Sequence, residues 1–146
     1  MSPLETTRID MLIPANHAEA INGLLYISGG GWTDVYRRIR AGVVPPNHFG
    51  IGVSVRIPWH ETNRIHKFVL EVQNEDATAT VVHAEGELNA GRPPQLAPGD
   101  VQHAVLAVNV DIVFPAPGGY RIVATLDEGA DTATWPFRVH DAHVPG

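Results

Sequence analysis

Residues Phe49–Ile57 read FGIGVSVRI, and residues His66–Val72, which follow a polar connection, read HKFVLEV. In both segments apolar side chains alternate with small or polar ones, which is the two-residue period of a half-buried strand. A hairpin in which Val55 lies opposite Phe68 brings the two apolar faces together, whereas a shift by one residue would turn one face outward. The stretch therefore predicts an antiparallel pair of strands with one buried face.

Further strand-like segments recur along the chain, with turn residues between them. At residues 22–23 the dipeptide Asn-Gly separates two apolar runs, which is typical of a two-residue hairpin turn because both residues tolerate positive φ. Residues 33–44 are ambiguous, because Val35 and Ile39 suit a short helical turn as well as a strand. The other expected strands are Arg8–Pro14, Ala18–Ile21, Leu24–Ile27, Thr78–Glu85, Ala104–Phe114, Tyr120–Leu126 and Ala133–Val139.

This pattern predicts an all-β fold, an immunoglobulin-like antiparallel β-sandwich of about eight or nine strands. Strands with one apolar face must bury that face against a second layer, which favours two packed sheets. The segment Pro117–Tyr120 is similar to the late hairpin of immunoglobulin-like sandwiches, where a Tyr begins a strand after a corner. We expect residues 1–146 to form a single domain, with residues 141–146 as a flexible tail.

Composition narrows the function classes. The chain has 146 residues, no cysteine and a net charge of −6. The absence of cysteine excludes disulfides, thiol catalysis and zinc–thiolate sites. The negative charge argues against nucleic acid and anionic membranes as partners. Because residues 1–8 do not resemble a signal peptide and no apolar run approaches the ~20 residues of a membrane helix, we expect a cytoplasmic protein.

Segments spread along the chain carry a further signal, namely Glu19 and residues 22–23, 25–32, 58–63 and 117–120. Together they resemble an uncharacterised family of small cytosolic proteins common in actinobacteria. The resemblance covers nearly the whole chain, and its most specific parts are the Gly-Gly-Trp segment 30–32 and the Trp-x-Glu-Thr-Asn segment 59–63. It implies a stand-alone β-domain without an assigned activity, and so adds nothing about chemistry.

The polar connection between the two central strands is the best candidate for a contact site. An indole beside charged and amide side chains has the composition of binding hot spots. The alternative is that Trp59 folds over the end of the sandwich and closes the core, because Trp side chains are usually mostly buried. The candidate ligand or partner contacts are Trp59, His60, Glu61, Asn63 and Arg64.

Two other clusters suggest chemistry less clearly. His60, Glu61 and His66 could bind a metal, but the helical His-Glu-x-x-His spacing is absent because position 64 is Arg. A strand-capping role for His66 is the simpler interpretation. The basic run 37–40 could hold an anion, although most such runs are solvated surface.

The sequence therefore predicts a non-enzymatic binding or assembly module without a cofactor. No motif supplies a nucleophile with its base, a metal shell or a cofactor cradle. The alternative is a metal-binding protein or an enzyme that uses the loop with His60, Glu61 and His66. We expect a protein partner or self-association into a homo-oligomer through a sheet edge or face, because the side of the central strand with Gly50, Gly52 and Ser54 carries little charge.

Overall fold

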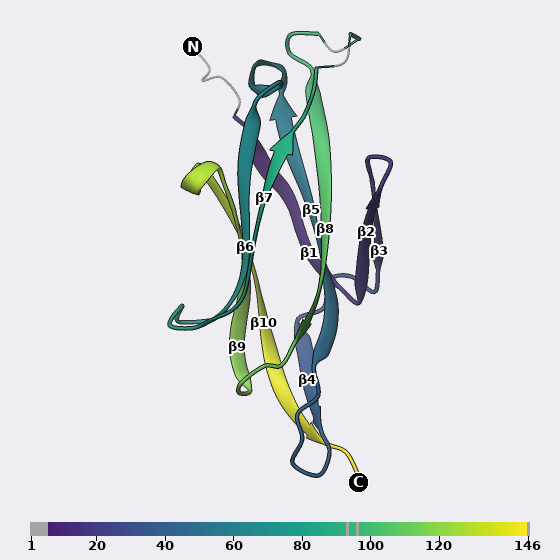
Figure 1. Cartoon of the computed structure of the whole chain (residues 1–146), viewed down its shortest axis with the longest axis vertical. Helices are drawn as coiled ribbons and strands as arrows, with labels where there is room; N and C mark the ends of the chain where they lie inside the picture. Colours follow the sequence, from purple (N-terminus) through teal and green to yellow (C-terminus); the bar gives the residue numbers. More distant parts are fainter. Residues whose placement is uncertain (1–5, 93, 96, 146) are drawn as a thin grey trace.

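The computed structural model describes residues 6–92, 94–95 and 97–145, and it is all-β (Figure 1). Outside the described residues lie residues 1–5, Pro93, Leu96 and Gly146, the last of which belongs to the expected tail. None of the described residues forms a helix long and apolar enough to span a membrane. The elements are β1 (Arg8–Ala15), β2 (His17–Ile21), β3 (Leu24–Ser28), β4 (Asp34–Ile39), β5 (Asn47–Pro58), η1 (Trp59–Glu61), β6 (Ile65–Asn74), β7 (Thr80–Asn89), β8 (Val101–Ile112), β9 (Gly118–Leu126), η2 (Asp127–Gly129) and β10 (Asp131–His143).

The described strands form three sheets. One has the order β1-β5-β8, the second has the order β4-β10-β9-β6-β7, and the third is the hairpin β2-β3. All neighbouring pairs are antiparallel except β4 and β10, which run parallel. Figure 1 shows the sheets as layers side by side, with β6 and β9 on the left, β5 and β8 in the middle and the hairpin β2-β3 on the right.

The core lies between the three-stranded and the five-stranded sheet. Phe49 of β5 packs edge to face against Phe137 of β10, and Phe114 packs against Tyr120 of β9. Because the strands bury alternate residues, each supplies every second side chain to this layer. The buried apolar residues of the core are Phe49, Ile51, Val53, Val55, Ile57, Phe68, Leu70, Val72, Leu88, Ala90, Ile112, Phe114, Tyr120, Ile122, Ala124, Leu126, Phe137 and Val139.

The predicted hairpin of the two central strands is wrong, although their buried faces are confirmed. β5 pairs with β1 and β8, whereas β6 pairs with β7 and β9. Val55 and Phe68 therefore belong to opposite sheets of one core rather than to neighbouring strands. The connection through η1 carries the chain from one sheet to the other. Alternation fixes which face of a strand is buried, but it does not choose the hydrogen-bonded partner.

The expectation of a single buried face on β5 is also corrected. The hairpin β2-β3 lies over the outer side of β5, and it buries Gly50 and Gly52. A Cβ atom at Gly50 would lie 2.6 Å from the backbone nitrogen of Ala18, and one at Gly52 would lie 2.5 Å from Cδ1 of Ile27. The glycines thus permit close approach of a third layer. Gly50 and Gly52 are consequently covered within the chain by the hairpin β2-β3.

Other local predictions have mixed outcomes. The Asn22-Gly23 turn is confirmed, with φ of 50° and 75°. In β1 a register shift between Ile9 and Met11 turns Leu12 toward the core, while Met11 is 38% exposed. The ambiguous residues 33–44 contain the strand β4, and residues 141–143 of the expected tail pair with β4 as the end of β10.

Candidate functional site

The predicted contact loop is fastened by Arg92. The guanidinium carbon of Arg92 lies 3.7 Å from the centroid of the Trp59 ring, which is a cation–π contact. Nε of Arg92 donates to the Thr62 hydroxyl at 2.8 Å, and Nη2 donates to the Trp59 carbonyl at 2.9 Å. Trp59 is half-buried and is not part of the core cluster. Its ring is therefore engaged by an arginine from the loop that precedes β8.

The remaining loop residues divide into fastened and exposed ones. Oε1 of Glu61 accepts a hydrogen bond from the backbone N–H of Thr7 at 2.7 Å, and its other oxygen lies 3.7 Å from a guanidinium nitrogen of Arg64. The backbone N–H of Asn63 donates to the Ala90 carbonyl at 2.8 Å. The side chains of His60, Asn63 and Arg64 are exposed.

Both ring nitrogens of His66 have hydrogen-bond partners. The imidazole is buried, with Nδ1 2.7 Å from Oδ2 of Asp127 and Nε2 2.9 Å from the Glu61 carbonyl. Both ring nitrogens face oxygen acceptors, so neither directs a lone pair toward a metal. In the part of the chain that the structure describes, no three His, Cys, Asp or Glu side chains are grouped as a metal ion would require. The geometry therefore assigns His66 a structural role.

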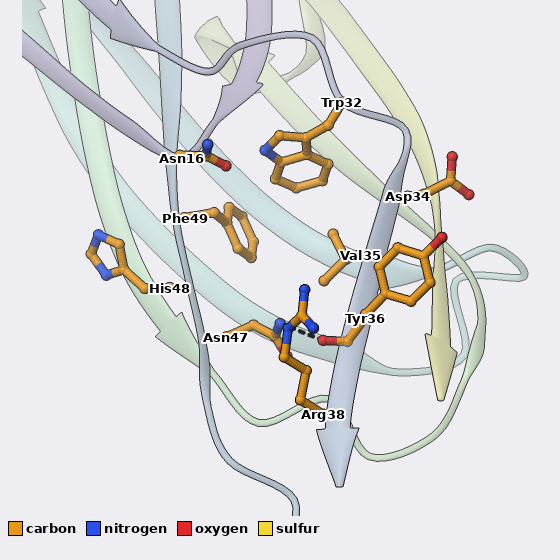
Figure 2. A pocket seen from close by; sticks show the side chains of 9 residues that line it. All are labelled: Asn16, Trp32, Asp34, Val35, Tyr36, Arg38, Asn47, His48 and Phe49. Carbon is orange, nitrogen blue, oxygen red and sulfur yellow. Dashed lines mark hydrogen bonds between the residues drawn. The ribbon is translucent and has the colours of Figure 1, made fainter. Parts of the chain in front are cut away.

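A pocket that the sequence interpretation missed lies where β4 faces the start of β5 (Figure 2). It has a volume of about 240 Å³. Its apolar and aromatic members come from the glycine-rich segment and the strands, while its polar members lie toward solvent. The lining residues are Asn16, Trp32, Asp34, Val35, Tyr36, Arg38, Asn47, His48 and Phe49.

The floor of the pocket is a fixed aromatic group. The Trp32 ring packs edge to face against Phe49 and Phe137, with centroids 5.3 and 5.5 Å apart. The indole N–H of Trp135 donates to the Trp32 carbonyl at 3.0 Å, which holds the segment that leads into β4. A floor that is already packed loses little side-chain entropy when it binds a partner.

One side of the pocket rim combines an exposed tyrosine with an acid–histidine pair. The Tyr36 ring stacks on His140 with centroids 5.1 Å apart, and Nε2 of His140 lies 2.7 Å from Oδ1 of Asp34. This hydrogen bond, with a second one from Thr33, holds the pKa of the Asp34 carboxyl below its ordinary value. Asp34 therefore stays ionised, and the stacked ring offers one face to solvent.

The other side of the rim supplies unused hydrogen-bonding groups. The Arg38 side chain is exposed and has no ion-pair partner among the described residues. Nδ2 of Asn47 donates to the Tyr36 carbonyl at 2.9 Å, while its Oδ1 is buried without a partner in the described part of the chain. The rim thus offers an exposed cation beside an aromatic ring.

The basic run 37–40 is divided by the alternation of β4. Arg37 points inward, where it is buried and bonded to Asp141, while Arg38 points outward to the pocket and Arg40 begins a turn. If residues 34–39 had been predicted as a strand, the sequence would have indicated that Arg37 and Arg38 point to opposite faces. The pocket itself could not be read from the sequence, because its members lie at 16, 32–38 and 47–49.

Comparison with known proteins gives one result about relatedness. Residues 10–140 match the model of DUF6941, a family of unknown function. No curated protein matches the chain.

Proposed function

We propose that this chain, which belongs to the DUF6941 family of unknown function, acts in the cytoplasm as a non-enzymatic binding and assembly module. The contact site for a protein partner is the pocket built around Trp32, Tyr36 and Arg38. The observation that carries the proposal is that the exposed Tyr36 and Arg38, which has no ion-pair partner among the described residues, line the same pocket as the packed Trp32 ring. Tyr, Trp and Arg are the residue types enriched at interface hot spots.

The size of the pocket favours a partner side chain over a cofactor. Pockets for drug-sized ligands occupy about 300–1,000 Å³, whereas this pocket measures about 240 Å³. One protruding side chain of a partner fits such a volume. The net charge of −6 disfavours nucleic acid and anionic membranes as that partner. The enzyme or metalloprotein alternative built on His60, Glu61 and His66 has less support, since His66 is fully engaged.

We also propose a type for the sandwich and a second contact region. The two larger sheets represent an immunoglobulin-like sandwich, supported by the Tyr120 hydroxyl, which donates to the Ala116 carbonyl at 2.7 Å in the manner of a tyrosine corner. The exposed loop residues His60, Asn63 and Arg64 form a secondary contact region, positioned by Trp59 and Glu61.

The test is affinity capture from native lysate, with mass-spectrometric identification, using the wild-type protein and the variants Tyr36→Ser and Arg38→Ala. The control is Tyr26→Ser, because Tyr26 on the hairpin β2-β3 is 53% exposed and Tyr36 is 46% exposed. We expect a partner that the wild type and the control capture and that both pocket variants lose, at unchanged melting temperatures. Equal capture by all four proteins would contradict the pocket as the contact site.

A further inference from the structure

β8 is a long edge strand with one open side. It pairs with β5 in an unbroken antiparallel register over twelve residues, from Val101 to Ile112. Within the described ranges no strand pairs with its other edge. It contains no Pro, Lys, Arg or Glu, and it has no register shift against β5. Apart from the charge of Asp111 near its end, such a strand lacks the devices by which proteins prevent edge-to-edge association.

The other edges of the two large sheets are protected. β1 carries a register shift, and the backbone N–H of Ile9 donates to Oδ2 of Asp131 at 2.8 Å. β7 presents Glu85 and Glu87. β4 has six residues, three of which are charged. Of the described strands at the edges of these sheets, β8 is therefore the one suited to accept a partner strand.

The core is also incomplete along β8. Its inward residues Ala104, Leu106 and Val108 are half-buried. Their neighbours on β5, which are Val55, Val53 and Ile51, are 0% exposed. A further strand beside β8 would cover this apolar row, and the hydrophobic effect favours that burial.

We propose that β8 pairs antiparallel with β8 of a second copy of this chain, about a two-fold axis at Ala107. This inference deepens the assembly part of the proposed function and uses the β8 edge instead of the pocket. An isologous interface requires a strand that is complementary to itself. About Ala107 the strand meets this requirement, because Leu106 falls opposite Val108 and Ala104 falls opposite Val110 of the second copy.

The positions of one histidine and one acid on β8 select this register and this occupant. The two ionisable residues of β8 are His103 and Asp111, which lie on the same outer face, four residues on either side of Ala107. The axis therefore places His103 of each copy opposite Asp111 of the other. Asp10 already contacts His103 at 3.0 Å, and His48 contacts Asp111 at 2.8 Å. Pairing thus joins Asp10, His103, Asp111 and His48 into a row in which acids and histidines alternate, and such hydrogen-bonding pairs across strands stabilise a sheet.

Solution mass tests the assembly. We expect sedimentation equilibrium at micromolar concentration to give about twice the monomer mass of 15.8 kDa. His103→Asp should raise the dimer dissociation constant roughly tenfold, because the axis repeats the resulting acid–acid contact twice. The melting temperature of the variant checks that it remains folded. A monomer across the micromolar range would overturn the inference, and so would a dimer that His103→Asp does not weaken.

Disulfide trapping tests the register. The chain has no cysteine, so Ala107→Cys introduces a single thiol at the axis. Directly opposite Cα atoms in an antiparallel pair are about 4.5–5.5 Å apart, within disulfide reach. The control Val105→Cys lies on the same face, but in this register its symmetry mate is about 13 Å away. We expect rapid cross-linking of Ala107→Cys and none of Val105→Cys. Equal cross-linking of both, or none of either, would overturn the register, and neither result depends on whether the pocket variants lose their partner.

Discussion

Arg37 and Asp141 form a two-point ion pair between the parallel strands β4 and β10. Nε of Arg37 lies 2.6 Å from Oδ1 of Asp141, and Nη2 lies 3.1 Å from Oδ2. The third nitrogen, Nη1, donates to the Phe114 carbonyl at 2.8 Å. The sequence places Arg37 in a run of basic residues that is typical of a surface. In the structure Arg37 instead connects the edge strand β4 and the start of the β8–β9 connection to the end of β10.

Asp141→Asn is expected to lower the melting temperature at neutral pH, because it leaves the buried Arg37 without a counter-charge. The hydrogen bond from Arg37 holds the pKa of the Asp141 carboxyl below its ordinary value of 3.8. The carboxylate therefore stabilises the fold fully above pH 3.8 and loses this effect as the pH falls through the lowered pKa. The difference in melting temperature between Asp141→Asn and the wild type should therefore disappear once the pH falls below that lowered pKa. Thermal melts at several pH values check this, and Glu128→Gln at an exposed pair serves as the control.

Gly50→Ala is expected to destabilise the fold by about 1–3 kcal/mol. The added Cβ would meet backbone atoms of β2, so the hairpin β2-β3 must shift. Urea unfolding measures the effect, and limited proteolysis reports whether the hairpin is released. Gly86→Ala is the matched control on β7, since its Cβ has no heavy atom within 4 Å. It should change stability by less than about 0.5 kcal/mol. An equal loss in both variants would contradict close packing at Gly50.

Phe68→Ala is expected to cost about 3–5 kcal/mol, because the ring is buried between the two large sheets. Ile65→Ala on the same strand is the control. Ile65 is 56% exposed, so its truncation should fall within about 0.5 kcal/mol of zero. Denaturant unfolding of the two variants measures the loss in free energy of unfolding for each. A loss below about 1 kcal/mol for Phe68→Ala would refute its place in the core.

A chelator is expected to leave the melting temperature unchanged, because His66 is held by Asp127 and the Glu61 carbonyl. Metal analysis of the dialysed protein and thermal melts with and without the chelator make the measurement. Stoichiometric zinc or iron that survives dialysis, together with destabilisation when it is removed, would instead support the metalloprotein alternative.

The sequence predicted those features that neighbouring residues determine. The buried faces of β5 and β6 follow from alternation, and the Asn22-Gly23 turn follows from the two residues themselves. The partners of β5 could not be predicted, because Asn47 pairs with Ile112 and Arg56 pairs with Arg8 through contacts distant in the sequence. Alternating glycines on β5 signalled a second packed face, although the sequence interpretation took them for an exposed one.

The candidate site was less predictable than the fold. Trp59 stood out as a large aromatic residue in a polar loop, but Arg92, which covers its ring, lies 33 residues away. Trp32 and Tyr36 become a site when β4 is placed beside β10 and the start of β5 lies across from it. A parallel strand pair has no tight connecting turn that the sequence could indicate. The residues near position 36 therefore did not predict that β4 lies beside β10.

The parallel pairing of β4 with β10 also affects when the protein can complete its fold during synthesis. Its two strands are joined by residues 104 positions apart, so a chain that is still being synthesised carries β4 and the charge of Arg37 without their partners until the end of β10 emerges. Closing a loop of this length lowers the conformational entropy of the chain before the contacts between the strands can stabilise it. The five-stranded sheet is therefore completed late, and nascent chains that stop short of Asp141 are the ones we expect quality-control proteases to remove.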